Sequence, residues 1–266
     1  MFDYYKDAES FKEASGYTID GVWYPRVTKI LSIKAKPALY RFYAEQESFK
    51  ASQAITEKSA AEGTLVHEAV EAIFLGQKPE VDPLIAPAIK AFEQFLQSKS
   101  IQTAPEYVER QILHPEHRYA GTIDLLALID GKFGVLDIKT SQAIYRDYNL
   151  QTAAYMAALK SAFGGQFQHL QTRWILKIDQ IQTCLKCGAT RRTKGGREKI
   201  SFWRNGNNSH NRDQMKTCEH EWSEVKGDIE FQEFPYWQND FEAFLGAKKL
   251  WEWENEFWLK KVGYLA

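Results

Sequence analysis

Hydrophobic residues recur at helical spacing in several parts of the chain. Between residues 60 and 75 the apolar positions fall three or four residues apart, and Gly76 follows as a stop signal, so a helix is predicted there. The same criteria predict helices over residues 85–99, 147–162 and 241–258. A moderate periodicity with several basic residues predicts a helical lobe between residues 27 and 57.

Short apolar or β-branched runs separated by turn residues are typical of strands. Such runs lie at residues 107–113, 121–129 and 133–140, and two more follow at residues 172–182 and 228–234. The succession of helices and strands predicts an α/β fold.

The dipeptide Asp130-Gly131 predicts a tight hairpin between the second and third of these strands. A two-residue turn places Ile129 opposite Lys132, and the same register places Asp124 directly opposite Asp137. Like charges in facing positions destabilise a sheet, so a cation is expected to compensate them.

The two aspartates interrupt strands that are apolar on both faces, as expected of a buried central pair. Clustered carboxylates are oxygen ligands that Mg²⁺ or Mn²⁺ prefers, and Lys139 lies on the same strand face as Asp137. The alternative is a structural ion pair between Asp137 and Lys139 beside a solvated Asp124.

The charge balance excludes a uniformly basic, duplex-coating surface. The 266 residues include 34 Lys and Arg against 35 Asp and Glu, a net charge of -1, so any nucleic-acid site must be local. No apolar run approaches the roughly 18 residues that a membrane span requires. The first residues lack a basic segment followed by an apolar one, so a cytoplasmic protein without membrane contact is expected.

Residues 184–221 differ in composition and separate the last two predicted strands. They carry nine Lys and Arg against four acidic residues, a local net charge of +5. Cysteine and histidine spacing there predicts a closed, structural Zn²⁺ site, with ligands Cys184, Cys187, Cys218 and His220. His210 is an alternative fourth ligand, and unrelated free cysteines are the alternative to a zinc site.

We expect this zinc-binding insertion to project as a finger from the edge of the sheet. Its charge and aromatic residues predict phosphate contacts and base stacking by Arg191, Arg192, Lys194, Phe202 and Trp203. The alternative is a solvent-exposed insertion in which the zinc has only a structural role and no nucleic acid is bound.

Four ordered motifs resemble those of a known family. They are Ala61-Glu-Gly-Thr-Leu-Val-His67, Gly121-Thr-Ile-Asp124, Asp137-Ile-Lys139-Thr and Gln151-x-x-x-Tyr155. Together they resemble the PD-(D/E)xK nuclease superfamily, in particular its RecB-type branch, which includes CRISPR-adaptation nucleases and a mitochondrial single-strand exonuclease. The resemblance implies a restriction-endonuclease-like core, with a mixed central β-sheet flanked by helices.

The resemblance also implies roles for the motif residues. A catalytic Mg²⁺ or Mn²⁺ would be held by Asp124, Asp137, the Ile138 carbonyl and His67. Lys139 would assist the attacking water, and the remaining site residues would be Gln151, Tyr155 and Glu109. Glu71, one helical turn after His67, would orient its imidazole or remain solvated.

The sequence departs from the family pattern at two positions, and some of the motif residues can have purely structural roles. Ile123 stands where the family's name-giving proline would be, and Asp137 replaces the commoner glutamate. A lone helical His67 can be structural, and Gln151 with Tyr155 can be a surface pair.

The expected organisation is a helical lobe at 1–59, a nuclease core at 60–183, the zinc-binding insertion at 184–221 and a last core strand with an aromatic helix at 222–266. The expected function is metal-dependent hydrolysis of DNA phosphodiester bonds, by an exonuclease acting on single strands or ends in DNA repair or recombination, with a possible helicase or recombination partner. The alternatives are a structure-specific or CRISPR-adaptation-like endonuclease, a non-catalytic DNA-end-binding helicase partner and a zinc-dependent protein-interaction module.

Overall fold

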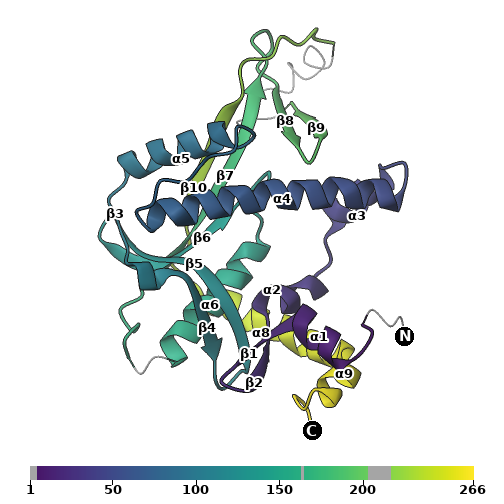
Figure 1. The fold of residues 1–266 in the computed structure, drawn as a ribbon, viewed down its shortest axis with the longest axis vertical. Helices are drawn as coiled ribbons and strands as arrows, with labels where there is room; N and C mark the ends of the chain where they lie inside the picture. Colours follow the sequence, from purple (N-terminus) through teal and green to yellow (C-terminus); the bar gives the residue numbers. More distant parts are fainter. Residues whose placement is uncertain (1–4, 163–164, 203–216) are drawn as a thin grey trace.

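A mixed sheet with helices on both faces forms the centre of the molecule (Figure 1). The computed structural model describes residues 5–162, 165–202 and 217–266. The eight strands of this sheet within those ranges are β3 (Ile101–Gln102), β4 (Val108–His114), β5 (Tyr119–Ile129), β6 (Lys132–Lys139), β7 (Thr172–Thr183), β8 (Thr190–Lys194), β9 (Arg197–Ser201) and β10 (Lys226–Glu233). The α/β class and the mixed sheet flanked by helices agree with the prediction.

The sheet order is β3-β5-β6-β7-β8-β9, with β4 also paired to β5 and β10 also paired to β7. Strands β6 and β7 run parallel, and the crossover between them contains a helix. The other described pairings in this sheet are antiparallel.

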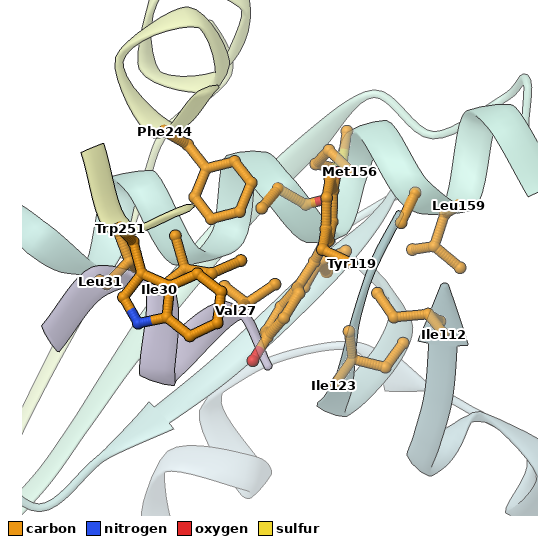
Figure 2. Packing of buried hydrophobic residues seen from close by; sticks show 14 of the residues in the cluster. Val27, Ile30, Leu31, Ile112, Tyr119, Ile123, Met156, Leu159, Phe244 and Trp251 are labelled. Atoms are coloured by element: carbon orange, nitrogen blue, oxygen red, sulfur yellow. The ribbon is translucent and has the colours of Figure 1, made fainter. Parts of the chain in front are cut away.

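Two hydrophobic clusters lie on opposite faces of the sheet. Helices α4 (Phe49–Phe74) and α5 (Ala86–Ser98) cover one face, where Val70 and Phe92 pack with Leu136 of β6. Helices α6 (Asp147–Ala162) and α8 (Gln238–Glu254) cover the other face together with α2 (Val27–Ile30). Figure 2 shows Tyr119, Met156 and Phe244 of this second cluster, in which the ring centroids of Tyr119 and Phe244 are 4.9 Å apart.

The remaining elements are α1 (Ala8–Ser15), β1 (Gly16–Ile19), β2 (Val22–Pro25), η1 (Leu31–Ile33), α3 (Pro37–Ala44), η2 (Pro105–Tyr107) and α9 (Glu256–Lys261). Several of them lie near the two chain ends, whereas α3 lies beside α4 (Figure 1) and η2 leads into β4. The β1–β2 hairpin was not predicted. The single helix predicted over residues 241–258 is instead divided into α8 and α9 at Asn255.

Helix α4 begins eleven residues before its predicted start, so the expected boundary between residues 59 and 60 falls inside a continuous helix. Ser48 caps it by accepting a hydrogen bond from the Ala51 amide at 3.1 Å. Of the first eleven helical residues, only Ser52 is buried, whereas Val66 and Val70 of the later turns pack on the sheet. The early turns lack an apolar stripe because they do not cover the hydrophobic sheet.

Helix α6 lies where the prediction placed it and is buried on all sides. Every residue from 152 to 159 is buried, and the Tyr119 hydroxyl donates to the Ala154 carbonyl at 2.8 Å. At Gly121 an added Cβ would lie 2.5 Å from a ring carbon of Tyr155. The absence of a side chain at this position therefore allows the Tyr155 ring to lie directly against β5.

None of the helices in the described ranges combines the length and apolarity needed to span a membrane.

Arg173 joins β7 to three other segments from a site where it is 1% exposed. Its guanidinium donates to the carbonyls of Asn149 at 2.6 Å and Tyr236 at 2.9 Å, and it is ion-paired with Asp240. Arg173→Met should lower the free energy of unfolding by about 3 kcal/mol, because it leaves a carboxylate and carbonyls without their donor.

Urea denaturation measures this effect. Arg173→Lys should rescue little of the loss, since one ammonium cannot reach the same set of acceptors. Exposed Arg146→Met is the control and should change stability by less than about 0.5 kcal/mol. A wild-type unfolding midpoint for Arg173→Met would contradict the assignment.

Candidate functional site

The predicted hairpin forms with the predicted register. Ile129 pairs with Lys132 and Leu125 pairs with Leu136, while Asp130 and Gly131 have φ values of 49° and 83°, as a two-residue turn of this kind requires.

The ladder between β5 and β6 ends one pair before the two aspartates. There the Asp124 side chain takes over from the backbone, because its Oδ2 accepts a hydrogen bond from the Ile138 amide at 2.5 Å. Asp124 is thereby fixed at the end of β6.

Asp137 and Lys139 form a buried ion pair. Asp137 Oδ2 lies 2.6 Å from the Lys139 ammonium, and the Asp137 side chain is 1% exposed. Its Oδ1 accepts from the Gln151 amide at 3.1 Å, and the same amide donates to the Tyr155 hydroxyl at 2.9 Å. Four of the predicted site residues therefore lie in one hydrogen-bonded group.

A second group brings together possible metal ligands from three elements. One donor atom each from His67 of α4, Glu109 of β4 and Asp124 of β5 lie within 4.8 Å of one another. The β4–β5 ladder pairs Val108 with Leu125 and resumes beyond Glu109, which adopts the left-handed φ of 46°. A non-glycine residue in this region is strained, so the surrounding structure holds Glu109 in its position.

Asp137 is not part of this donor group, and its carboxylate faces Lys139 and Gln151 instead. The side chains predicted to bind the metal were His67, Asp124 and Asp137. In the structure the donors that converge are His67, Asp124 and Glu109, so Glu109 replaces Asp137. Ile138 lines an adjacent cleft with Lys139, and its role as a carbonyl ligand stays a prediction.

The carboxyl groups of the site destabilise one another's charged forms. Burial, together with the charges of Asp124 and Glu71, raises the pKa of Glu109 to about 7, although much of the Glu109 side chain is exposed. Burial raises the pKa of Asp137 to about 6, with Lys139 opposing the shift and Asp124 adding to it. Burial also raises the pKa of Asp124. A bound cation would relieve this repulsion.

The two basic groups respond in opposite directions. Burial disfavours the charged form of Lys139, but Asp137 and Asp124 outweigh it, so the Lys139 pKa is raised and the ammonium stays charged. Burial and the charge of Lys139 lower the pKa of His67. At neutral pH His67 is therefore the neutral imidazole that a metal ion requires.

Two clefts meet at His67. One, of about 440 Å³, has acidic side chains along its wall: Glu68, Glu71, Glu109 and Asp124. The other, of about 360 Å³, is lined by Lys139, Lys194 and hydroxyl groups, with no carboxylate among its lining side chains. The first cleft is suited to a cation and the second to an anion.

The anion cleft contains residues that the motif pattern did not indicate. Tyr148 lies in the first turn of α6, and the centroid of its ring is 5.1 Å from the Lys139 ammonium. Lys194 comes from the insertion, more than fifty residues after Lys139, so no local spacing could have associated the two.

The predicted cysteine and histidine ligands converge at the base of the insertion. Donor atoms of Cys184, Cys187, Cys218 and His220 all lie within 4.8 Å of one another. The Cys184 and Cys218 sulfurs are 3.9 Å apart, close to the edge of about 3.8 Å in a tetrahedron with Zn–S bonds of about 2.3 Å. Three thiols and an imidazole at these separations fit Zn²⁺.

Two of the expected finger residues lie outside the described residues, namely Trp203 and the alternative ligand His210. Of the basic residues expected to contact phosphate, Arg191 pairs with Glu198 at 3.1 Å and Arg192 pairs with Asp179. The β8–β9 hairpin lies beside α4 instead of projecting freely (Figure 1). Much of the insertion's positive charge is thus used within the molecule.

Neither a family model nor a curated protein sequence matches this chain.

The acidic cleft predicts a pH-dependent stability that a metal ion should suppress. Between pH 4.5 and 7 folded Glu109 keeps a proton that the unfolded chain has lost, so the free energy of unfolding of metal-free protein should fall as pH rises through this window. Glu109→Gln should flatten that decline and, after allowance for solvent screening, stabilise metal-free protein at pH 8 by about 1 kcal/mol.

Urea denaturation at pH 5 and pH 8, with and without Mn²⁺, measures this behaviour. Mn²⁺ should stabilise the wild type at pH 8 and stabilise Asp124→Asn and Glu109→Gln much less. Equal stabilisation of the wild type and Asp124→Asn would rule out the three-donor site.

The cysteine cluster predicts about one tightly bound zinc per chain. Cys187→Ser should lose the metal and lower the melting temperature, whereas His210→Ala should retain it if His220 is the fourth ligand. Elemental analysis of the purified proteins tests both statements, and zinc loss in His210→Ala would instead assign that histidine.

Proposed function

We propose that this chain is a divalent-metal-dependent deoxyribonuclease with a restriction-endonuclease-like core of the PD-(D/E)xK type. The observation that carries the proposal is the arrangement of the two clefts around His67, one acidic and one basic, with Lys139 of the Asp137–Lys139 pair on β6 lining the basic one. Phosphodiester hydrolysis needs these two environments side by side, because a cation and an anionic phosphate must meet at one point.

His67, Glu109 and Asp124 would hold Mg²⁺ or Mn²⁺, with Asp137 adjacent. When bound, the cation polarises a phosphate oxygen and lowers the pKa of a water molecule. The donor set fits this role, since carboxylate oxygens suit both ions and the neutral imidazole completes the group. The raised carboxyl pKa values are a further reason to expect a cation here.

Lys139 would stabilise the negative charge that builds on the phosphate as the water oxygen bonds to phosphorus and the ester oxygen departs with a proton. Its ammonium is held charged by Asp137 at 2.6 Å. Gln151 would keep the Asp137 carboxylate oriented, and Tyr155 would in turn fix the Gln151 amide. Gln151 and Tyr155 are thus positioning residues in this proposal.

A structural Zn²⁺ on the cysteine cluster would fix the base of the insertion without taking part in the chemistry. Single-stranded DNA or DNA ends remain the proposed substrates, with a role in repair or recombination.

The test is incubation of the wild type with end-labelled linear single-stranded DNA in Mn²⁺ or Mg²⁺, with and without chelator. Asp137→Asn and Lys139→Met should reduce the cleavage rate by about 10²-fold or more. Lys139→Met removes the positive charge at the reacting phosphate, and Asp137→Asn removes the carboxylate that holds Lys139 charged and in place. Lys132→Met, on the same hairpin but exposed and paired with Glu233, is the matched control and should cleave at the wild-type rate.

The outcomes separate the alternatives. Cleavage of linear but not circular single strands indicates an exonuclease, and cleavage of both indicates an endonuclease. Wild-type rates in a folded Lys139→Met protein would overturn the assignment, and metal-independent binding without any cleavage would favour a non-catalytic DNA-end-binding protein.

A further inference from the structure

The β8–β9 hairpin of the insertion lies against helix α4 (Figure 1). Arg192 and Lys194 of the hairpin also donate to the carbonyl of Thr140, directly after β6. The Gly195 amide at its tip donates to Glu62 Oε1 at 2.9 Å. A Cβ on Gly195 would lie 2.4 Å from the Ile55 carbonyl oxygen, and the residue has a left-handed φ of 61°. Only glycine satisfies both conditions, so the hairpin tip is fitted to the helix.

This docking carries Lys194 into the anion cleft. Its ammonium donates to the carbonyl of Thr140, the residue that follows Lys139. Both lysines line the cleft together with the hydroxyl-bearing residues Ser141 and Tyr148. The insertion therefore supplies a wall of the same cleft as the proposed catalytic lysine.

Lys194 differs from the three arginines of the hairpin in its lack of a counter-ion, and from exposed Lys199, which bonds to Gln142, in its partial burial. Within the described ranges, Arg191, Arg192 and Arg197 each have a carboxylate at ion-pair distance, whereas Lys194 has none. Burial lowers the pKa of Lys194 to about 8, with Asp179 opposing the shift. A partly buried ammonium whose recorded acceptor is a neutral carbonyl gains from an anionic partner.

We propose that Lys194 binds a backbone phosphate of the DNA strand, so that the zinc-binding insertion forms part of the substrate site. The inference rests on the proposed nuclease function. The charge of the insertion predicted a phosphate contact for Lys194, and the structure adds the position of that residue beside Lys139 in one cleft. The phosphate bound by Lys194 would neighbour the one that faces Lys139, because the two lysines line one cleft. Lys194 is a substrate-binding residue in this proposal and takes no part in bond cleavage.

The binding test uses a fluorescein-labelled twelve-nucleotide oligothymidylate, followed by anisotropy in buffer without added Mg²⁺ or Mn²⁺. Lys194→Met keeps most of the side-chain volume and removes the charge. It should raise the dissociation constant about five- to tenfold at low salt and reduce the slope of log affinity against log salt by about 0.7, the loss of one phosphate contact. Lys194→Arg should retain most of the affinity.

Lys186→Met is the matched control. It removes one positive charge from the same insertion, at an exposed position beside the cysteine cluster and outside the residues that line the anion cleft, and it should leave the salt slope unchanged. Thermal melting of each variant checks that the fold is retained. Lys194→Met should melt at or above the wild-type temperature, because removing a poorly compensated buried charge costs little.

The results separate this inference from the nuclease assignment. A wild-type affinity and salt slope in Lys194→Met, or a wild type that does not bind the oligonucleotide, would overturn the role of Lys194. If the wild type binds through Lys194 but cleaves no DNA with any metal tested, the nuclease proposal fails and the phosphate site stands. If cleavage occurs and Lys194→Met matches the wild type, only the inference on Lys194 fails.

Discussion

Two carboxylates placed inside an apolar pair of strands are the constraint on which the site depends. Asp124 and Asp137 lie among residues that pack on both faces of the sheet, and such charges are tolerated only where they are paired or bind a cation. The fold meets this demand in two ways. Asp124 accepts the Ile138 amide, and Asp137 pairs with Lys139. The β5–β6 ladder ends there, and the hydrogen bond from the Ile138 amide to the Asp124 side chain takes its place.

Helix α4 organises the space next to these carboxylates. Its later turns pack on the sheet and its early turns support the β8–β9 hairpin, so a single rigid element fixes both the core and the insertion. His67 follows Val66 in the later turns and lines both clefts. The separation of acidic from basic side chains thus follows from the path of one helix across the edge of the sheet.

Sequence patterns indicated most of the central elements and the contacts that depend on local register. Asp130-Gly131 predicted the pairing of β5 with β6 correctly. Asp20-Gly21 also forms a hairpin turn, but this hairpin was not predicted because its two strands have only four residues each. Strand β8 was also missed, since Thr190–Lys194 is polar and is held by ion pairs and by contact with α4. The left-handed backbone of Glu109 and the approach of Lys194 to Lys139 arise from tertiary packing. The periodicity of apolar residues along the sequence carries no information on such packing.

The pairing of β7 with β10 has a consequence for how this architecture can diversify. Ile181 and Lys226 face each other in that ladder, so the insertion between β7 and β10 begins and ends at neighbouring positions. His67, Glu109 and Asp124 all precede the departure point, while Lys194 lies beyond it. Segments of different length or charge could be exchanged between these two positions without disturbing the groups proposed to hold the cation. In the proposed nuclease, the contacts to the substrate strand and the metal site could thus evolve separately within one chain.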